Sequence, residues 1–322
     1  MSEYETNLVQ NEDDEIDLGE LLNVLWINRL FIAALIGIFS IVSLIISLFL
    51  TNIYTAQATL APTPSEDISA NLSRYAGLAS LAGITLPGSS SGISDKDLAL
   101  TLIKSKTILS ILIEKHNILP DLVAAKSWDL SSNSIIYDPQ LYDNNKKKWV
   151  RRVKPPYGLI PSTQEAFELY DEIVVFSEDK KTQIITLEVS HLSPDIAFQW
   201  LNLIIQEVNG YLAEMRIKEA QLSIDYLNDQ LEITPYPELR NLFYQLIQQY
   251  TQTMMLAKVK TQYALTTLDA PLIPEEESSP SRPLIVILCT LLGGLVATLI
   301  ILVRFYGFKL KDPIKISLVN YR

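Results

Sequence analysis

The sequence contains two apolar stretches without a single charge, LFIAALIGIFSIVSLIISLFL (Leu30–Leu50) and LIVILCTLLGGLVATLIILV (Leu284–Val303). Each has about 20 residues, the length that crosses a hydrocarbon core of about 30 Å as an α-helix. Two crossings place both ends of the chain on one side of a membrane and residues from about Thr51 to Arg282 on the other. We therefore predict a two-span membrane protein with one large domain between its spans.

Charges beside the spans predict the orientation. The tail after the second span is basic, with Arg304, Lys309, Lys311, Lys315 and Arg322, and Arg29 precedes the first span. Because Lys and Arg near span ends favour the cytoplasm, we predict that the tails 1–29 and 304–322 are cytoplasmic. A long acidic tail precedes the first span, unlike the basic start of a cleaved signal peptide, so this span is predicted to be a permanent anchor.

The composition argues against several classes of function. A net charge of −11 disfavours a nucleic-acid binder. Cys289, the only cysteine, lies inside the second span, and the chain has only two histidines, so neither a Cys/His metal site nor any cofactor is expected. There is no Gly-rich phosphate loop ending in Gly-Lys-Ser/Thr. His116 and His191 lack a nucleophile partner in the sequence and are predicted to be surface or turn residues.

Residues 51–192 are predicted to form a mixed α/β base. Tyr54–Leu60 alternates as a strand does, and β-branched runs at 173–177 and 183–190, split by a charged turn, predict a hairpin. Helices are predicted at 98–116, with a break near Ser105, and at 162–170, where Ser162 and Glu165 have the spacing of a capping box.

Residues 193–265 are predicted to form a long helical arm. Ser193-Pro194-Asp195 is a strong helix start, and no proline follows until Pro235. The apolar stripe of this helix shifts phase after Met215, which suggests a change of packing partner or a local stutter. A second helix is predicted from Glu238 to about Tyr263. The fold class is therefore an α+β domain with a long helical hairpin or arm, flanked by N- and C-terminal transmembrane helices.

A return segment, 266–283, ends in a proline-rich strap, defined here as Pro271–Pro283. Prolines prevent a helix and hold the chain extended. The candidate residues of the strap are Pro271, Pro274, Ser279, Pro280 and Pro283.

Small residues mark one face of the second span. Cys289, Gly293 and Ala297 recur at intervals of four, and Gly294 adjoins them. Small residues at this spacing let helices approach closely in lipid. Association with another span and an ordinary mixture of small residues remain equally open interpretations.

A basic run stands out in the acidic chain, with Lys146, Lys147, Lys148, Arg151, Arg152 and Lys154. Two interpretations are open. The run contacts an anionic glycan or lipid headgroups, or it is a solvated loop anchored by Trp149.

Several of these segments resemble the Wzz-type polysaccharide co-polymerases, the chain-length determinant proteins. The similar segments are Asp14-Glu15-Ile16-Asp17-Leu18, Tyr54-Thr55-Ala56, Lys104-Ser105-Lys106 and Gln183–Asp195. The strap also resembles the family's motif, as Pro271-x2-Pro274-x4-Ser279-Pro280 followed by the glycine pair.

The resemblance implies a multi-pass protein of the bacterial inner membrane with a periplasmic α/β base and a helical arm. It implies a bell-shaped homo-oligomer that has no catalytic activity and works with a Wzy-type polymerase. Its partners would be undecaprenyl-diphosphate-linked polysaccharide, such as the O-antigen of lipopolysaccharide, and membrane lipids. Some relatives add a cytoplasmic tyrosine kinase, which we do not expect in the 19 residues after the second span.

Three other classes are considered. A two-span periplasmic adaptor of a polysaccharide export system would share the helical hairpin. A chemoreceptor needs a large cytoplasmic output domain, and a glycan-active enzyme needs a positioned acid/base pair. The chain-length regulator accounts best for the spans, the strap and the long helices together.

Overall fold

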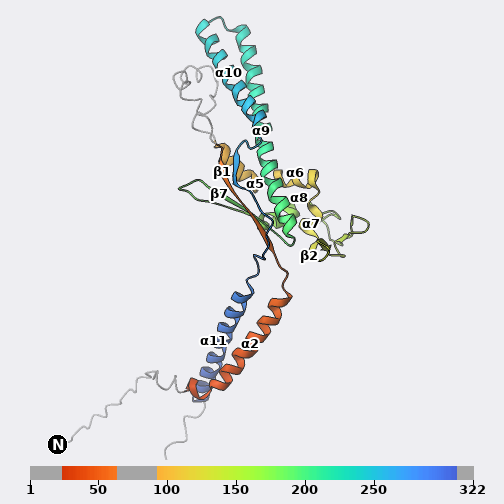
Figure 1. Cartoon of the computed structure of the whole chain (residues 1–322), viewed down its shortest axis with the longest axis vertical. Helices are drawn as coiled ribbons and strands as arrows, with labels where there is room; N and C mark the ends of the chain where they lie inside the picture. Colours follow the sequence, from red (N-terminus) through yellow and green to blue (C-terminus); the bar gives the residue numbers. More distant parts are fainter. Residues whose placement is uncertain (1–23, 64–92, 310–322) are drawn as a thin grey trace, which may run out of the picture. The chain divides into compact units, whose positions relative to one another are not determined.

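The computed structural model describes residues 24–63 and 93–309. The acidic lead-in 14–18 of the resemblance and most of both tails lie outside the described residues. The chain divides into two compact units, one containing the two terminal apolar helices and the other residues 52–278. The predicted fold class is confirmed, because the structure mixes helices and a sheet and carries two long apolar helices near its ends (Figure 1).

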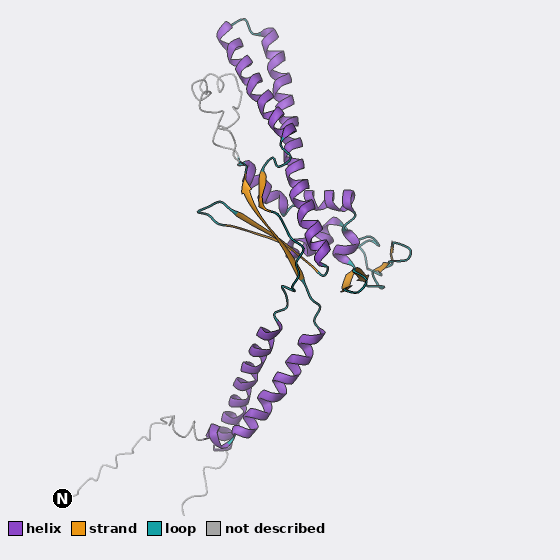
Figure 2. Ribbon diagram, in the orientation of Figure 1, coloured by secondary structure: helices purple, strands orange, loops and turns teal. Residues whose placement is uncertain are grey.

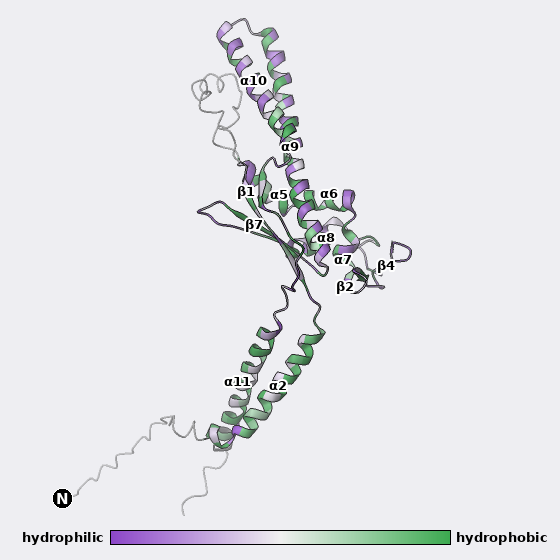
Figure 3. Cartoon of the chain, in the orientation of Figure 1, coloured by the Kyte–Doolittle hydropathy of each residue, from purple (hydrophilic) through white to green (hydrophobic). Residues whose placement is uncertain are grey.

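The first unit consists of helices α2 (Arg29–Phe49) and α11 (Arg282–Lys309), which pack along one another. Both are long and apolar enough to cross a membrane. Hydrophobic residues surround most of each helix (Figure 3), and side chains such as Leu30, Phe49 and Leu295 are exposed. Apolar side chains of this kind suit contact with lipid. A helix also satisfies its own backbone hydrogen bonds there.

The second unit is built on a four-stranded antiparallel sheet in the order β6-β7-β1-β8 (Figure 2). Its strands are β1 (Tyr54–Pro62), β6 (Val174–Glu178), β7 (Ile185–His191) and β8 (Leu265–Asp269). Ala56, Ala58 and Leu60 alternate toward the core and stand opposite Val189, Leu187 and Ile185. One face is therefore apolar and covered, as the period of two requires.

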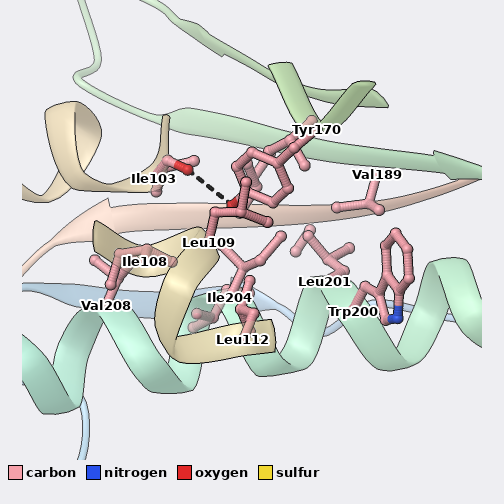
Figure 4. Packing of buried hydrophobic residues seen from close by; sticks show 14 of the residues in the cluster. Ile103, Ile108, Leu109, Leu112, Tyr170, Val189, Trp200, Leu201, Ile204 and Val208 are labelled. Carbon is pink, nitrogen blue, oxygen red and sulfur yellow. Dashed lines mark hydrogen bonds between the residues drawn. The ribbon is translucent and has the colours of Figure 1, made fainter. Parts of the chain in front are cut away.

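Helices cover that face. They are α5 (Asp95–Ile103), α6 (Lys106–His116), α7 (Leu119–Val123), α8 (Thr163–Ile173) and the first part of α9 (Pro194–Ile233). Their side chains interlock in one core, in which the hydroxyl of Tyr170 donates a 2.8 Å hydrogen bond to the carbonyl of Ile103 (Figure 4). The predicted helix break lies at Ser105, which caps α6 by accepting from the amide of Ile108.

The 40 residues of α9 change partner along its length. At 1.5 Å per residue the helix is about 60 Å long. Its first half buries residues such as Leu201 and Val208 against the sheet. Its second half packs against α10 (Pro237–Val259) and forms a separate apolar cluster of Leu227, Leu231, Leu242, Phe243 and Leu246. The phase shift in the stripe reflects this change, and α10 ends before the predicted Tyr263.

Two short hairpins between α7 and α8 were not predicted from the sequence. They are β2 (Ala125–Asp129) with β3 (Ser134–Tyr137), and β4 (Tyr142–Asp143) with β5 (Lys148–Trp149). Aromatic contacts hold the second one, since Tyr142 packs on Trp149 with ring centroids 5.2 Å apart. The two-residue strands β4 and β5 are too short to show a readable period.

A buried amide joins α9 to the sheet. Asn209 Oδ1 accepts from the backbone amides of Ala264 (2.9 Å) and Leu265 (3.0 Å). Its Nδ2 donates to the carbonyls of Leu265 and Ile205, both at 3.0 Å. Asn209 is only 1% exposed, so every one of these bonds is shielded from water and expensive to break.

Replacing Asn209 by leucine should lower the free energy of unfolding by about 2–4 kcal/mol, because buried backbone groups of β8 lose their partners. Denaturant unfolding of the purified full chain measures the change. Asn202→Leu is the matched control, since Asn202 is exposed on the same helix and bonds only to the carbonyl of Phe198. Equal losses in both variants would contradict this role of Asn209.

Candidate functional site

The strap follows β8, has an isolated β-bridge at Ser279, and ends in the first turn of α11. Pro271 is buried, while Leu272 and Ile273 are exposed. Pro274 and Pro280 are partly exposed, and Pro283 lies in the first turn of α11. This position suits proline, because the first turn of a helix needs no backbone donor there.

Hydrogen bonds tie the end of the strap to the start of β1. Ser278 donates to the carbonyl of Ile53 from both its amide (2.9 Å) and its hydroxyl (3.0 Å). Its Oγ also lies 2.7 Å from Oγ1 of Thr55, which lies 2.9 Å from Oγ of Ser190. Since the carbonyl of Ile53 can only accept, the hydroxyls donate in one direction, from Ser190 to Thr55 to Ser278.

A side-chain amide adds a second tie, because Nδ2 of Asn52 donates to Glu277 Oε2 at 2.5 Å. We call this set the strap anchor: Asn52, Ile53, Thr55, Ser190, Glu277 and Ser278. Sequence reasoning selected the prolines and Ser279, which is exposed, and missed Glu277 and Ser278. The prolines mark an extended chain, whereas the anchoring partners are more than 200 residues away in sequence.

The small residues of the second span lie at its contact with α2. A Cβ added at Gly293 would meet Cβ of Phe39 at 2.8 Å and its Cγ at 2.9 Å. Ala297 is fully buried and Cys289 is half-buried, whereas a Cβ added at Gly294 would meet Cδ1 of Ile36 at an ordinary contact distance of 3.6 Å. Close approach at Gly293 therefore depends on the missing side chain.

The basic run divides into an exposed part and a buried part. Lys146, Lys147, Lys148, Arg152 and Lys154 are exposed. Arg151 is buried, and its guanidinium donates to Oε2 of Glu165 at 2.6 Å and to the carbonyl of Gly158 at 2.6 Å. Arg151 is therefore a structural residue, and its charge is already used inside the fold.

Glu165 completes this buried link. Its Oε1 accepts from Arg151 and from the amide of Ser162, which closes the predicted capping box of α8. The hydrogen bonds from Arg151 are the main cause that lowers the pKa of Glu165 to about 2.

The two histidines both have structural partners. Nε2 of His116 lies 2.9 Å from Oε1 of Glu207, and Oε2 of the same carboxylate pairs with Lys115. His191 was expected at the surface, and this prediction is wrong: it is buried at the end of β7 and packs on Trp200 at 5.0 Å.

The hydrogen bonds of His191 fix its protonation. Its Nδ1 accepts from the amide of Ser193 and its Nε2 donates to the carbonyl of Asp121, so the ring is neutral. Burial lowers its pKa accordingly.

Together these features define a two-helix candidate membrane protein with an α+β unit, a helical hairpin and an anchored proline-rich strap. Residues 14–116 match the family model Wzz, chain length determinant protein. This match agrees with the resemblance drawn from the sequence. No curated protein matches the chain significantly.

Two solved structures match the chain at low identity and low TM-score. One is a full-length bacterial polysaccharide co-polymerase, with 15% identity and a TM-score of 0.38 over 93% of this chain and all of that chain. The other is a fragment of WzzB, a polysaccharide co-polymerase from Salmonella Typhimurium, with 18% identity and a TM-score of 0.28 over 71% of this chain and all of that chain.

Gly293→Ala should destabilise the pair of spans by about 1–3 kcal/mol, because the new Cβ overlaps Phe39. Gly294→Ala is the matched control and should be nearly neutral, since its Cβ meets Ile36 at an ordinary 3.6 Å. Thermal unfolding of the detergent-solubilised full chain compares them. A Gly293→Ala protein as stable as the control would show that the close approach is unimportant.

The stability of the second unit should fall in acid as Glu165 becomes protonated. Folding lowers its pKa from 4.5 to about 2, so its stabilisation is complete above about pH 4.5 and is lost as the pH falls toward 2. Glu165→Gln should reduce this acid sensitivity, as measured by unfolding at pH 7 and pH 3. Glu168→Gln, an exposed change on the same helix, should retain it; identical pH profiles for both variants would contradict the assignment.

Proposed function

We propose that this protein is a non-enzymatic, homo-oligomeric co-polymerase of the bacterial inner membrane. It regulates the chain length of a surface polysaccharide, such as O-antigen, together with a Wzy-type polymerase. The observation that carries this proposal is the chain-length-determinant match over residues 14–116, in a chain with two candidate spans. In this proposal both tails are cytoplasmic and residues 52–278 lie in the periplasm, as the basic residues beside the spans favour.

The ionisable groups with shifted pKa values hold parts of the fold together, as we propose for a scaffold. Groups with shifted pKa values have structural partners: Glu165 binds Arg151, Asp97 accepts from the helix-capping Ser94, and Glu207 binds Lys115. Among the described residues no group of three or more His, Cys, Asp or Glu side chains could hold a metal ion. Shifted carboxylates at catalytic sites instead face a cleft that admits substrate.

The helical arm supports self-association. Its outer surface exposes Leu222, Tyr226, Ile233, Tyr244, Met255 and Val259. These exposed apolar side chains of α9 and α10 are available to pack against a neighbouring copy. In a homo-oligomer, neighbouring copies of the arm would cover them, and the strap anchor would hold the two ends of each periplasmic unit together.

Deletion of the gene tests this function. We expect a loss of the modal length in the surface-polysaccharide ladder on a gel, with shorter and more random chains, and recovery on complementation with the wild-type gene. An unchanged ladder would contradict the proposal. Cross-linking of the native complex should capture further copies of this chain and a polymerase; capture of an exporter in place of a polymerase would favour the adaptor class.

A further inference from the structure

A concavity of about 560 Å³ lies beside the hairpin β4–β5 (labelled β4 in Figure 3). The residues that line it are Tyr137, Pro139, Tyr142, Asp143, Asn144, Asn145 and Val150. Its volume is within the range of small-ligand sites, roughly 300–1,000 Å³. The combination of aromatic rings and amide groups in one hollow is the feature that needs an explanation.

The aromatic part of the hollow is held rigidly. Tyr142 packs between Tyr137, with centroids 5.3 Å apart, and Trp149, at 5.2 Å. The hydroxyl of Tyr137 donates to Asp121 Oδ1 at 2.5 Å. These contacts fix the ring positions before any ligand arrives, which reduces the entropy lost on binding.

The polar rim is also preformed. Asp143 Oδ1 accepts from the backbone amides of Asn145 (3.0 Å) and Lys146 (3.2 Å) and thereby sets the turn. In the described part of the chain, the side-chain amides of Asn144 and Asn145 make no hydrogen bond. Each amide therefore offers donors and an acceptor to a ligand in the hollow.

The surroundings are positively charged. Lys147 and Lys148 are exposed on the same hairpin, and Lys146 has only a 3.8 Å contact with Asp143. Arg152 and Lys154 follow on the exposed chain. A local cluster of cations in a chain with a net charge of −11 favours a ligand of opposite charge.

We propose that this concavity binds a segment of polysaccharide that carries carboxylate or phosphate groups. The inference rests on the proposed function and names the contact with the growing chain. Sugar rings present C–H groups that pack on the tyrosines and hydroxyls that bond to the asparagine amides, while the lysines attract the acidic groups. Lipid headgroups would require the charges but not the aromatic and amide lining.

Equilibrium binding with the full chain in detergent tests the site. The probe is polysaccharide released by mild acid from the surface of the source bacterium. We expect Asn144→Ala/Asn145→Ala to weaken binding about fivefold or more, because the polysaccharide loses its hydrogen bonds to two side-chain amides. Lys147→Glu/Lys148→Glu should weaken it about tenfold or more, and added salt should weaken wild-type binding.

Lys180→Glu/Lys181→Glu is the matched control, since it reverses two exposed lysines in the turn between β6 and β7. It should bind like wild type. Equal affinity for the polysaccharide in all variants would overturn the site. So would variants that bind the polysaccharide normally but bind vesicles of anionic phospholipid more weakly than wild type. If gene deletion changes the ladder while these variants bind normally, the concavity is refuted and the proposed function stands; an unchanged ladder on deletion refutes the proposed function itself.

Discussion

The side-chain amide of Asn209 is the point on which the second unit depends. It bonds the long helix α9 to β8, the last strand of the sheet, through Ala264 and Leu265. An edge strand presents unpaired backbone groups, and Asn209 satisfies some of them from a helix. The same helix continues into the arm, and the same strand continues into the strap. Asn209 therefore holds the helix that leads into the arm against the strand that leads into the strap.

The strap anchor performs the corresponding task at the other end of β1. The chain enters the unit at Asn52 and leaves it at Ser278, and hydrogen bonds join these ends directly. Closing a loop of more than 200 residues costs entropy that grows only slowly with its length, so a few polar contacts suffice once the sheet has formed. Because β8 pairs with β1 along the sheet edge, the anchor extends an existing contact.

Periodic patterns allowed the long elements to be predicted from the sequence. The alternation in β1 and β7, the capping box at Ser162 and the uninterrupted α9 are local signals that follow from side-chain geometry. The burial of His191 and Arg151 and the link through Asn209 were missed, because each depends on partners supplied by distant segments or by a loop. A polar residue within an apolar stripe does not reveal whether it faces water or a buried backbone group.

The basic run shows how this limit affects a functional interpretation. Arg151 and the other basic residues of the run look equivalent in sequence, yet only Arg151 is buried in the fold. The planar fork of Arg151 matches both oxygens of Glu165 and also reaches the carbonyl of Gly158. Arg152 and the lysines remain exposed, so the position of Arg151 beside Glu165 and Gly158 decides its burial together with its guanidinium. The charge of Arg151 thus pairs with Glu165 of α8 inside the fold. The other basic residues lie at the surface, where their charge can be changed without disturbing the core.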